Sequence, residues 1–350
     1  GAEVIKIENP GTGGDVSRFV SPHLIGDTDS QFFQTFNRNK KSLSLDLKTG
    51  EGRKAFEELV KSADAVSNNL RGDLPAKLKI DYASLKAINP KIVCAHLSAY
   101  GRGNSREAWP GYDYLMQAEA GFCSVTGEPD GPPVRLGLSM VDFMTGSMLA
   151  TGLVAAVLGA YKTGTGSDID VSLFDTALHQ TSYPATWYLN DGVVTTRQPR
   201  GAHPSIVPSQ LMQAGDGWIM FCCQTQKFWE RLCECLGKPK WITDPRFVKV
   251  EDRRDNRAVV QDEVEAVLKT NTVSFWMEKF GGYVPAAPVF DIAQALDSPY
   301  VNEIEMTYHD EHPLMQDGIR MLSSPYKYNG KRLKGGIAPK LGEHTDELLK

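Results

Sequence analysis

The sequence has few cysteines, no block of like charge and no long apolar run. Six cysteines in 350 residues, two of them adjacent, make a poor disulfide framework, so we expect a reducing compartment, either the cytoplasm or the mitochondrial matrix. The net charge of -5 is spread along the chain, which argues against a nucleic-acid partner. The longest apolar run, 148–160, is shorter than the roughly 18 to 20 residues of a membrane span. We therefore expect a core helix and no membrane.

No metal or nucleotide motif in the sequence is complete. Cys233 and Cys235 are two residues apart and would lie on different faces of a helix, with no CxxC partner. His309 and His312 have no third ligand in view. The glycines at 164–166 are too few for a dinucleotide fingerprint, which also needs a following helix. We therefore expect no metal site.

Strand and helix patterns alternate through the first half of the chain. Residues 42–47 alternate polar and apolar side chains, as a half-buried strand does. Residues 55–60 then place apolar side chains on one helical face. Further strands are predicted at 4–7, 63–67, 92–99 and 169–175. This order predicts a parallel sheet with crossover helices, and a ligand at the carboxyl ends of its strands.

A smaller α+β domain is expected in the second half. Prolines, glycine and arginines cluster early in 196–214, which we interpret as a linker. The segment 215–217 predicts a hairpin turn between two strands. We therefore expect a large α/β domain from 1–195 and 319–350, and a smaller domain with its return linker at 215–318.

One carboxylate, Asp142, precedes the most apolar segment of the chain. Residues 147–158 have almost no polar side chains and predict a helix buried on most of its faces. Asp142 would lie near the N-terminus of that helix, where the macrodipole and free N–H groups favour an anion. A helix cap is the alternative role for such an aspartate. Asp175 is a rival nucleophile at the end of a predicted strand, and we expect it to cap the next helix.

Five ordered motifs resemble those of the family III CoA-transferases, also called the CaiB/BaiF family. They are 1–8, 37–42, 45–48, the segment around Asp142, and 341–345. Several motifs in family-like order form a stronger signal than any one of them alone. The resemblance covers nearly the whole chain. It implies a Rossmann-like parallel-sheet large domain, a smaller α+β domain and an interlocked homodimer. In the family, a strand and a glycine-bearing helix precede the strand with which this sequence begins.

The resemblance also implies a catalytic residue and a CoA site. Asp142 would attack an acyl-CoA thioester to give an aspartyl anhydride, and then an aspartyl-CoA thioester. CoA thioester is a substrate in this chemistry, and no metal or redox cofactor takes part. The residues implied in CoA binding are Arg38, Lys40, Leu45, Asp46, Leu47, Lys48, Asn69, Leu70, Arg71, Lys77, Gly111, Tyr112 and Asp113. In the basic cluster at 38–41, Lys41 is a further candidate for the phosphates, and a solvated turn is the alternative.

Tyr112 bears on which reaction is expected. The racemase branch of the family has a histidine at this point, because epimerisation needs one base on each face of the α-carbon. A phenol has a pKa of about 10 and is a poor base at pH 7, so Tyr112 favours transfer over racemisation. An acyl-CoA racemase or epimerase, and a non-catalytic CoA-binding subunit of a hetero-oligomeric transferase, stay open. Similarity to succinyl-CoA:glutarate-type transferases suggests succinyl-CoA as donor, while 222–226 lacks the glycines expected of an oxalate enzyme.

Overall fold

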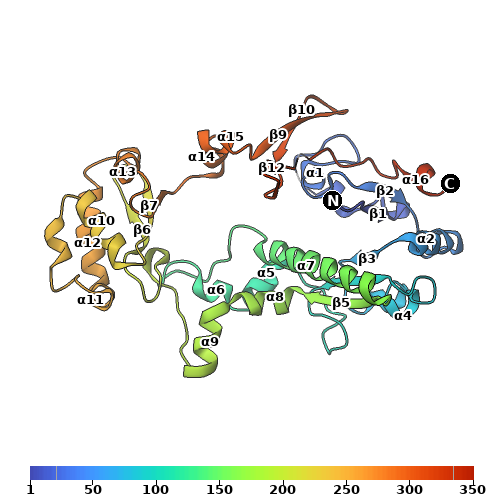
Figure 1. Cartoon of the computed structure of the whole chain (residues 1–350), viewed down its shortest axis with the longest axis horizontal. Helices are drawn as coiled ribbons and strands as arrows, with labels where there is room; N and C mark the ends of the chain where they lie inside the picture. The colour runs from blue at the N-terminus through green and yellow to red at the C-terminus, as the bar shows by residue number, and fades with distance from the viewer. Residues whose placement is uncertain (21, 334) are drawn as a thin grey trace. The chain divides into compact units, whose positions relative to one another are not determined.

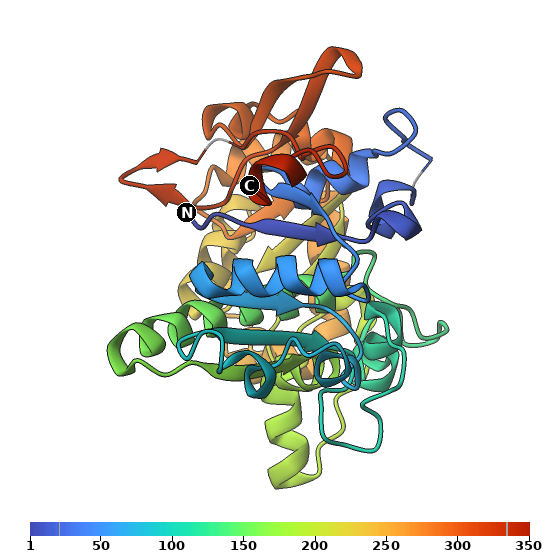
Figure 2. The same cartoon turned by 90° about the vertical axis from the view of Figure 1, so that its right-hand side faces the viewer.

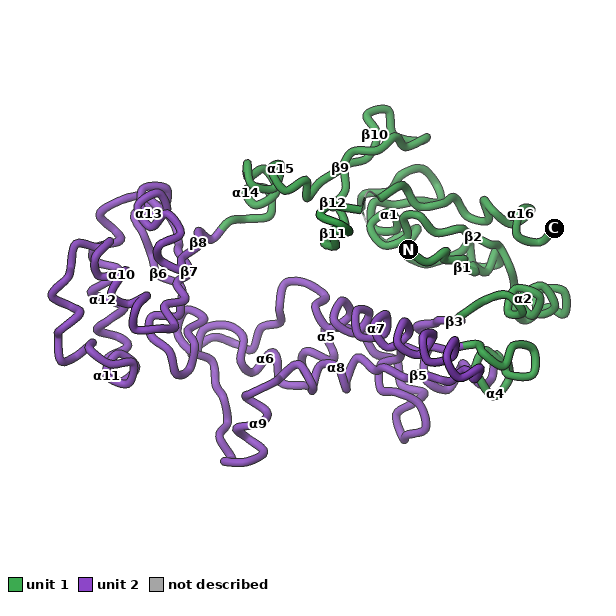
Figure 3. The backbone as a smooth tube through the Cα atoms, viewed as in Figure 1, with its two compact units in different colours: residues 1–64, 78–92, 290–350 green, residues 65–77, 93–289 purple. Residues whose placement is uncertain are grey.

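The structure, a computed structural model, describes residues 1–20, 22–333 and 335–350. It divides into two compact units (Figure 1, Figure 3). Unit 1 comprises 1–64, 78–92 and 290–350, and unit 2 comprises 65–77 and 93–289. Each unit is therefore built from segments that are far apart in the sequence.

Unit 1 contains two short parallel strands and an antiparallel hairpin. β1 (Ile5–Glu8) pairs in parallel with β2 (Lys41–Ser44) (Figure 2). β9 (Thr307–His312) pairs antiparallel with β10 (Met315–Leu322). The remaining elements are η1 (Pro10–Thr12), η2 (Val16–Arg18), α1 (Gln31–Asn37), α2 (Gly50–Ser62), α4 (Tyr82–Leu85), α14 (Ile292–Leu296), α15 (Pro299–Glu303), β11 (Lys327–Tyr328), β12 (Lys331–Arg332) and α16 (Thr345–Leu348).

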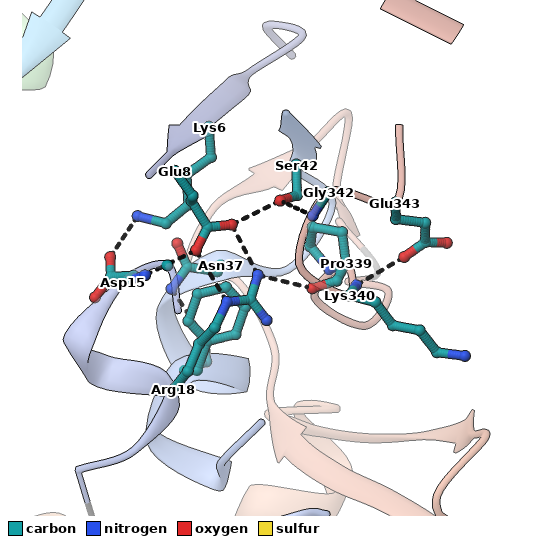
Figure 4. A network of polar contacts seen from close by, with 12 residues as sticks. Lys6, Glu8, Asp15, Arg18, Asn37, Ser42, Pro339, Lys340, Gly342 and Glu343 are labelled. Atoms are coloured by element: carbon teal, nitrogen blue, oxygen red, sulfur yellow. Dashed lines mark hydrogen bonds and ion pairs between the residues drawn. The ribbon is translucent and has the colours of Figure 1, made fainter. Parts of the chain in front are cut away.

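A buried ion pair joins the first strand of unit 1 to the end of the chain (Figure 4). The Arg18 guanidinium donates to both carboxylate oxygens of Glu8, at 2.9 and 2.8 Å. Ser42 Oγ donates to Glu8 at 2.6 Å and accepts from Gly342 N at 2.9 Å, while Arg18 also donates to Pro339 O at 3.2 Å. Burial opposes ionisation of Glu8, but the hydrogen bonds from Arg18 and Ser42 outweigh it and hold the pKa of Glu8 below its ordinary value.

Breaking this pair is expected to destabilise the protein strongly. Arg18→Met leaves a buried carboxylate without its counter-ion, so the free energy of unfolding should fall by about 3–5 kcal/mol in urea titrations. Lys61→Gln removes a partner of Glu58 from an exposed pair and should cost less than about 1 kcal/mol. Because the folded pKa of Glu8 is depressed, its contribution is present above the unfolded pKa and is lost as pH falls through the folded pKa. Equal stability of Arg18→Met and wild type at neutral pH would contradict this.

Unit 2 contains a three-stranded parallel sheet with β4 (Val93–Ser98) at its centre, between β3 (Ala65–Asn68) and β5 (Ser167–Ser172). The long helix α7 (Met140–Thr163) packs on one face, where a Cβ on Gly152 would lie 3.6 Å from Ile169 Cγ2. Around it lie α3 (Leu74–Lys77), α5 (Asp113–Glu119), α6 (Phe122–Val125), α8 (Leu173–Gln180) and α9 (Ser182–Asp191). The predicted parallel strands and crossover helices of an α/β fold are therefore present.

The rest of unit 2 is an antiparallel sheet covered by helices. β6 (Ser209–Gln213), β7 (Trp218–Cys222) and β8 (Ala286–Pro288) pair in that order, and the predicted hairpin joins the first two. The other elements are η3 (Pro199–Gly201), α10 (Gln226–Cys235), η4 (Pro239–Ile242), α11 (Val250–Asp255), α12 (Arg257–Leu268) and α13 (Val273–Phe280). The end of the predicted linker, 196–214, therefore lies in a strand. The division into a large and a small domain stays a prediction.

Helix α7 is not buried on most of its faces in the single chain, and that expectation is wrong. Only Val141, Thr145 and Ala160 of its residues are buried, and Val154 is 70% exposed. Within unit 2, α7 packs on β4, β5, α5 and α8. By length and apolar composition alone the helix could cross a membrane, but core helices of soluble proteins pass the same test.

Candidate active site

Asp142 lies in the first turn of α7 with its carboxylate exposed. Its backbone N–H donates to Asp113 Oδ2 at 2.9 Å, so the N-terminus of α7 is capped by a side chain from α5. Ser139, the residue before the helix, makes no side-chain cap. Among the described residues no hydrogen bond to the Asp142 carboxylate is found. Asp142 therefore does not serve as the helix cap, and its carboxylate is available to a ligand.

A buried amide holds Asp113 in place. Gln117 Nε2 donates to Asp113 Oδ1 at 2.5 Å and to Leu138 O at 3.2 Å, and Gln117 Oε1 accepts from Leu136 N at 2.8 Å. Both side chains are nearly fully buried, Gln117 at 0% and Asp113 at 3% exposure. Gln117 thus fixes both the capping carboxylate and the segment that leads into α7. The sequence reasoning did not identify Gln117, although its position four residues after Asp113 on α5 places the two on one helical face.

The two carboxylates influence each other. Although Asp142 is exposed, the neighbouring protein displaces part of the water around its carboxyl; this partial desolvation, and then the nearby charge of Asp113, raise the pKa of the Asp142 carboxyl above its ordinary value. The positive end of the helix dipole acts in the opposite direction. A carboxylate with a raised pKa is more basic and therefore a better nucleophile towards a carbonyl carbon.

Seven of the predicted CoA-binding residues, Asp113 among them, lie in unit 2. Asn69, Leu70 and Arg71 follow β3, and Arg71 and Lys77 share Asp73, at 3.2 and 2.7 Å. Gly111 needs to be glycine, because a Cβ there would lie 2.3 Å from Ala99 Cβ. The exposed Tyr112 precedes α5, whose first residue is Asp113. Through the Asp113 to Asp142 hydrogen bond, the structure brings the group at 111–113 next to the candidate nucleophile.

The other six predicted CoA-binding residues lie in unit 1. Arg38 donates to Tyr308 Oη at 3.3 Å and to Leu322 O. Lys40 donates to Asn37 Oδ1 at 3.0 Å, and burial and the charge of Lys6 lower its pKa. The segment 45–48 follows β2: Leu45 is buried, Leu47 is half-buried, and Asp46 Oδ1 accepts from Lys48 N at 3.0 Å.

Of the basic cluster, Lys41 already has carboxylate partners. Its Nζ lies 2.7 Å from Glu347 and 3.3 Å from Glu3. No ion pair of Arg38 or Lys40 is found among the described residues. Arg38 and Lys40 therefore suit a phosphate group better than Lys41 does.

The predicted capping role of Asp175 is wrong. β5 ends at Ser172, and the Ser172 Oγ accepts from Asp175 N at 2.9 Å, so Ser172 caps α8. The strand ends three residues earlier than predicted, which moves the capping position to the serine. Asp175 is then the third residue of its helix, as Asp142 is of α7.

The family model described as CoA-transferase family III matches residues 1–345. The chain belongs to this family. The succinyl-CoA:mesaconate CoA-transferase of Haloarcula hispanica is 32% identical over 358 residues, covering 100% of this chain and 89% of that protein. The acetyl-CoA:oxalate CoA-transferase of Acetobacter aceti is 33% identical over 357 residues, covering 100% and 88%. The crystal structure of a CAIB/BAIF family protein from Brucella suis has a TM-score of 0.85 at 30% identity, covering 100% and 92%.

These comparisons confirm three predictions. The chain is a family III CoA-transferase, its fold is mixed α/β with parallel sheets, and its activity is CoA transfer. In this CoA-transferase the exposed carboxylate of Asp142, next to a buried carboxylate that caps its helix, is an arrangement suited to attack on a thioester.

Proposed function

We propose that this CoA-transferase moves CoA from succinyl-CoA to a free dicarboxylic acid, with Asp142 as the covalent nucleophile. The observation that carries the proposal is the exposed carboxylate of Asp142, whose backbone N–H is held by Asp113 while the carboxylate itself accepts no hydrogen bond among the described residues. The names of the succinyl-CoA-using relatives support the choice of donor and the dicarboxylate class of acceptor.

The reaction exchanges one thioester for another. An oxygen of Asp142 attacks the donor carbonyl, the C–S bond breaks, and CoA leaves as a thiolate while an acyl-aspartyl anhydride forms. The thiolate then attacks the aspartyl carbonyl carbon, the donor acid leaves, and an aspartyl-CoA thioester remains. The acceptor carboxylate then attacks the aspartyl-CoA thioester and releases the CoA thiolate. The thiolate attacks the acceptor carbonyl of the new anhydride, which gives the product thioester and frees Asp142. The thioesters are of similar energy, so the protein chiefly supplies positioning and exclusion of water, which hydrolyses anhydrides.

A substrate panel tests the proposed activity. Labelled succinyl-CoA is incubated with mesaconate, glutarate, oxalate and a hydroxy acid, and CoA esters are followed by mass spectrometry. The proposal predicts a labelled product with at least one dicarboxylate. Deuterium uptake at the α-carbon of a 2-methylacyl-CoA without free acid would instead indicate a racemase. CoA binding without any transfer would indicate a non-catalytic subunit.

The pH dependence of transfer follows from the raised pKa of Asp142. Attack requires the ionised carboxylate, so kcat/KM for succinyl-CoA should fall in acid with an apparent pKa above that of an ordinary aspartate. Asp113→Asn removes the neighbouring charge and should move this limb to lower pH. The expectation would be contradicted if the acid limb of the wild-type kcat/KM profile had the pKa of an ordinary aspartate and Asp113→Asn did not move it.

A homodimer is the assembly we expect, because α7 exposes large apolar side chains. Val154 and Leu158 are exposed by 70 and 54%. Such contiguous apolar faces mark interaction sites in soluble proteins. A second copy fits better than a membrane, because the opposite side of α7 packs on β4 and β5.

The dimer is expected to persist on dilution. Sedimentation velocity should give a dimer at all protein concentrations measured, and Leu158→Lys, which replaces an exposed apolar side chain of α7 by a charge, should shift the protein towards monomers or aggregates. Lys162→Gln, at the polar end of the same helix, should leave the dimer intact. A wild-type monomer whose fraction grows on dilution would contradict this assembly, and so would partition of the protein into vesicles.

A further inference from the structure

A chain of three polar side chains crosses the parallel sheet of unit 2. His96, on the central strand β4, is only 2% exposed. Its Nδ1 lies 2.8 Å from Asn68 Nδ2 on β3, and its Nε2 lies 2.9 Å from Asp168 Oδ1 on β5. Asn68 and His96 are register partners, as are His96 and Asp170, and Asp168 shares the face of Asp170 because it lies two residues before it on β5. All three side chains therefore lie on the same face of the sheet, opposite to the face that α7 covers.

The hydrogen bond from Leu70 determines which atom donates in each contact between Asn68, His96 and Asp168. Asn68 Oδ1 accepts from Leu70 N at 3.3 Å, so its Nδ2 is the group that faces His96. His96 Nδ1 must then be an acceptor, and the ring proton lies on Nε2, which donates to Asp168. Asp168 is held in turn by Arg102, whose Nη2 lies 3.3 Å from Asp168 Oδ2. Arg102 is anchored by Asp170 at 2.6 and 3.0 Å.

These three hydrogen-bonded side chains end at a turn on the edge of the sheet where ligands of α/β folds bind. Asn68 is the last residue of β3, and the turn 69–71 lies at the carboxyl end of a parallel strand, where ligands bind in α/β sheets. The turn carries Arg71, which with Lys77 surrounds Asp73. After the turn, Gly72 packs directly against the backbone of Gly101, because a Cβ at position 72 would lie 2.1 Å from Gly101 O. The turn is thus anchored by Asn68 at one end and by Gly72 at the other.

We propose that Asp168, His96 and Asn68 are positioning residues that hold the turn 69–71 in the conformation that binds the CoA moiety. This rests on the proposed function, and on the CoA-binding role that the family resemblance implies for Asn69, Leu70 and Arg71. Asn68, His96 and Asp168 would affect CoA affinity and not the chemical step, because none of the hydrogen bonds or ion pairs described for them involves Asp142 or Asp113. His96 uses both ring nitrogens in this role, as an acceptor towards Asn68 and a donor towards Asp168.

The test measures CoA affinity and the rigidity of the turn in the same variants. Asn68→Ala removes the hydrogen bond to Leu70 N, His96→Leu removes the link to Asp168, and Asp168→Ala removes the acceptor while Arg102 keeps Asp170. Asp168→Asn is the milder variant: its amide oxygen still accepts from Nε2, while its amide nitrogen turns towards Arg102, which keeps Asp170. CoA binding is followed by calorimetry, the Leu70 amide by hydrogen exchange, and transfer by kcat and KM.

We expect Asn68→Ala and His96→Leu each to weaken CoA binding about tenfold, equivalent to about 1.4 kcal/mol. The double variant should lose little more than either single one, because both act through one contact. KM for succinyl-CoA should rise with kcat changed by less than about threefold, and Leu70 should exchange faster. Asp168→Asn should lose less CoA affinity than Asp168→Ala, because it keeps an acceptor for His96 Nε2.

Unchanged CoA affinity and unchanged Leu70 exchange in Asn68→Ala would overturn the inference, whatever the loss of thermal stability. If His96 had a purely structural role, His96→Leu would lower the melting temperature and leave CoA affinity unchanged. If His96→Leu does not fold, Asn68→Ala and Asp168→Ala decide the matter. A wild-type protein that binds no CoA would refute the proposed function instead, and faster Leu70 exchange in Asn68→Ala would still support the positioning of the turn.

Discussion

Asp142→Asn is expected to reduce CoA transfer by a factor of about a thousand or more, because an amide cannot form the acyl anhydride. CoA binding should remain close to that of wild type. Stability at neutral pH should be unchanged or slightly higher. Burial and Asp113 raise the pKa of Asp142, so its ionised form carries a cost that is present above the folded pKa and absent below the unfolded one.

Asp175→Asn is the matched control for this substitution. Asp175 is also exposed, is also the third residue of an α-helix, and has its N–H held by a cap, here Ser172. The variant should keep wild-type transfer. If Asp175→Asn abolished transfer while Asp142→Asn retained it, the nucleophile would be misassigned.

The second large effect is expected at Asp113. Asp113→Leu leaves the N–H of Asp142 and the amide of Gln117 without their acceptor in a buried site. Loss of such a cap typically costs about 1 kcal/mol of stability, and the penalty for unpaired buried groups adds to it. Because the first turn of α7 carries the nucleophile, we expect kcat to fall about a hundredfold, since small displacements of a reacting group have effects of that size.

A paired substitution separates position from charge. Both oxygens of Asp113 accept hydrogen bonds, so Asp113→Asn must turn its amide nitrogen towards one of the two donors. Adding Gln117→Glu supplies an acceptor for that nitrogen and keeps the one for Leu136 N, but removes the donor to Leu138 O. The double variant should therefore recover part of the kcat that Asp113→Asn loses. Additive losses in the two single variants and the double variant would contradict the coupling between Gln117 and Asp113.

Local sequence patterns predicted much of the fold. Alternation in 42–47 and the apolar face at 55–60 correspond to β2 and α2, and the predicted turn at 215–217 joins β6 to β7. Asp142 was placed at the start of a helix from the apolar run that follows it, and α7 begins there. These features depend on residues close together in the chain, which is why the sequence alone sufficed.

What the sequence did not give depends on distant contacts. The role of Gln117 requires that the segment 136–138 lies against α5, and no pattern within α5 reports this. The hydrogen bonds from His96 to Asn68 and Asp168 depend on the register of three strands that lie far apart in the sequence. The apolar composition of α7 predicted burial, but composition does not say whether the covering surface comes from the same chain.

The most direct test of the proposed chemistry is to trap the intermediate. Wild-type protein is incubated with succinyl-CoA and no acceptor acid, reduced with borohydride, digested, and mapped by mass spectrometry. The mechanism predicts an aspartyl-CoA thioester, which reduction converts to an alcohol at residue 142, and predicts no such product in Asp142→Asn. A reduced residue at Asp175, or turnover with no modified residue at position 142, would contradict the assignment of Asp142 as the nucleophile.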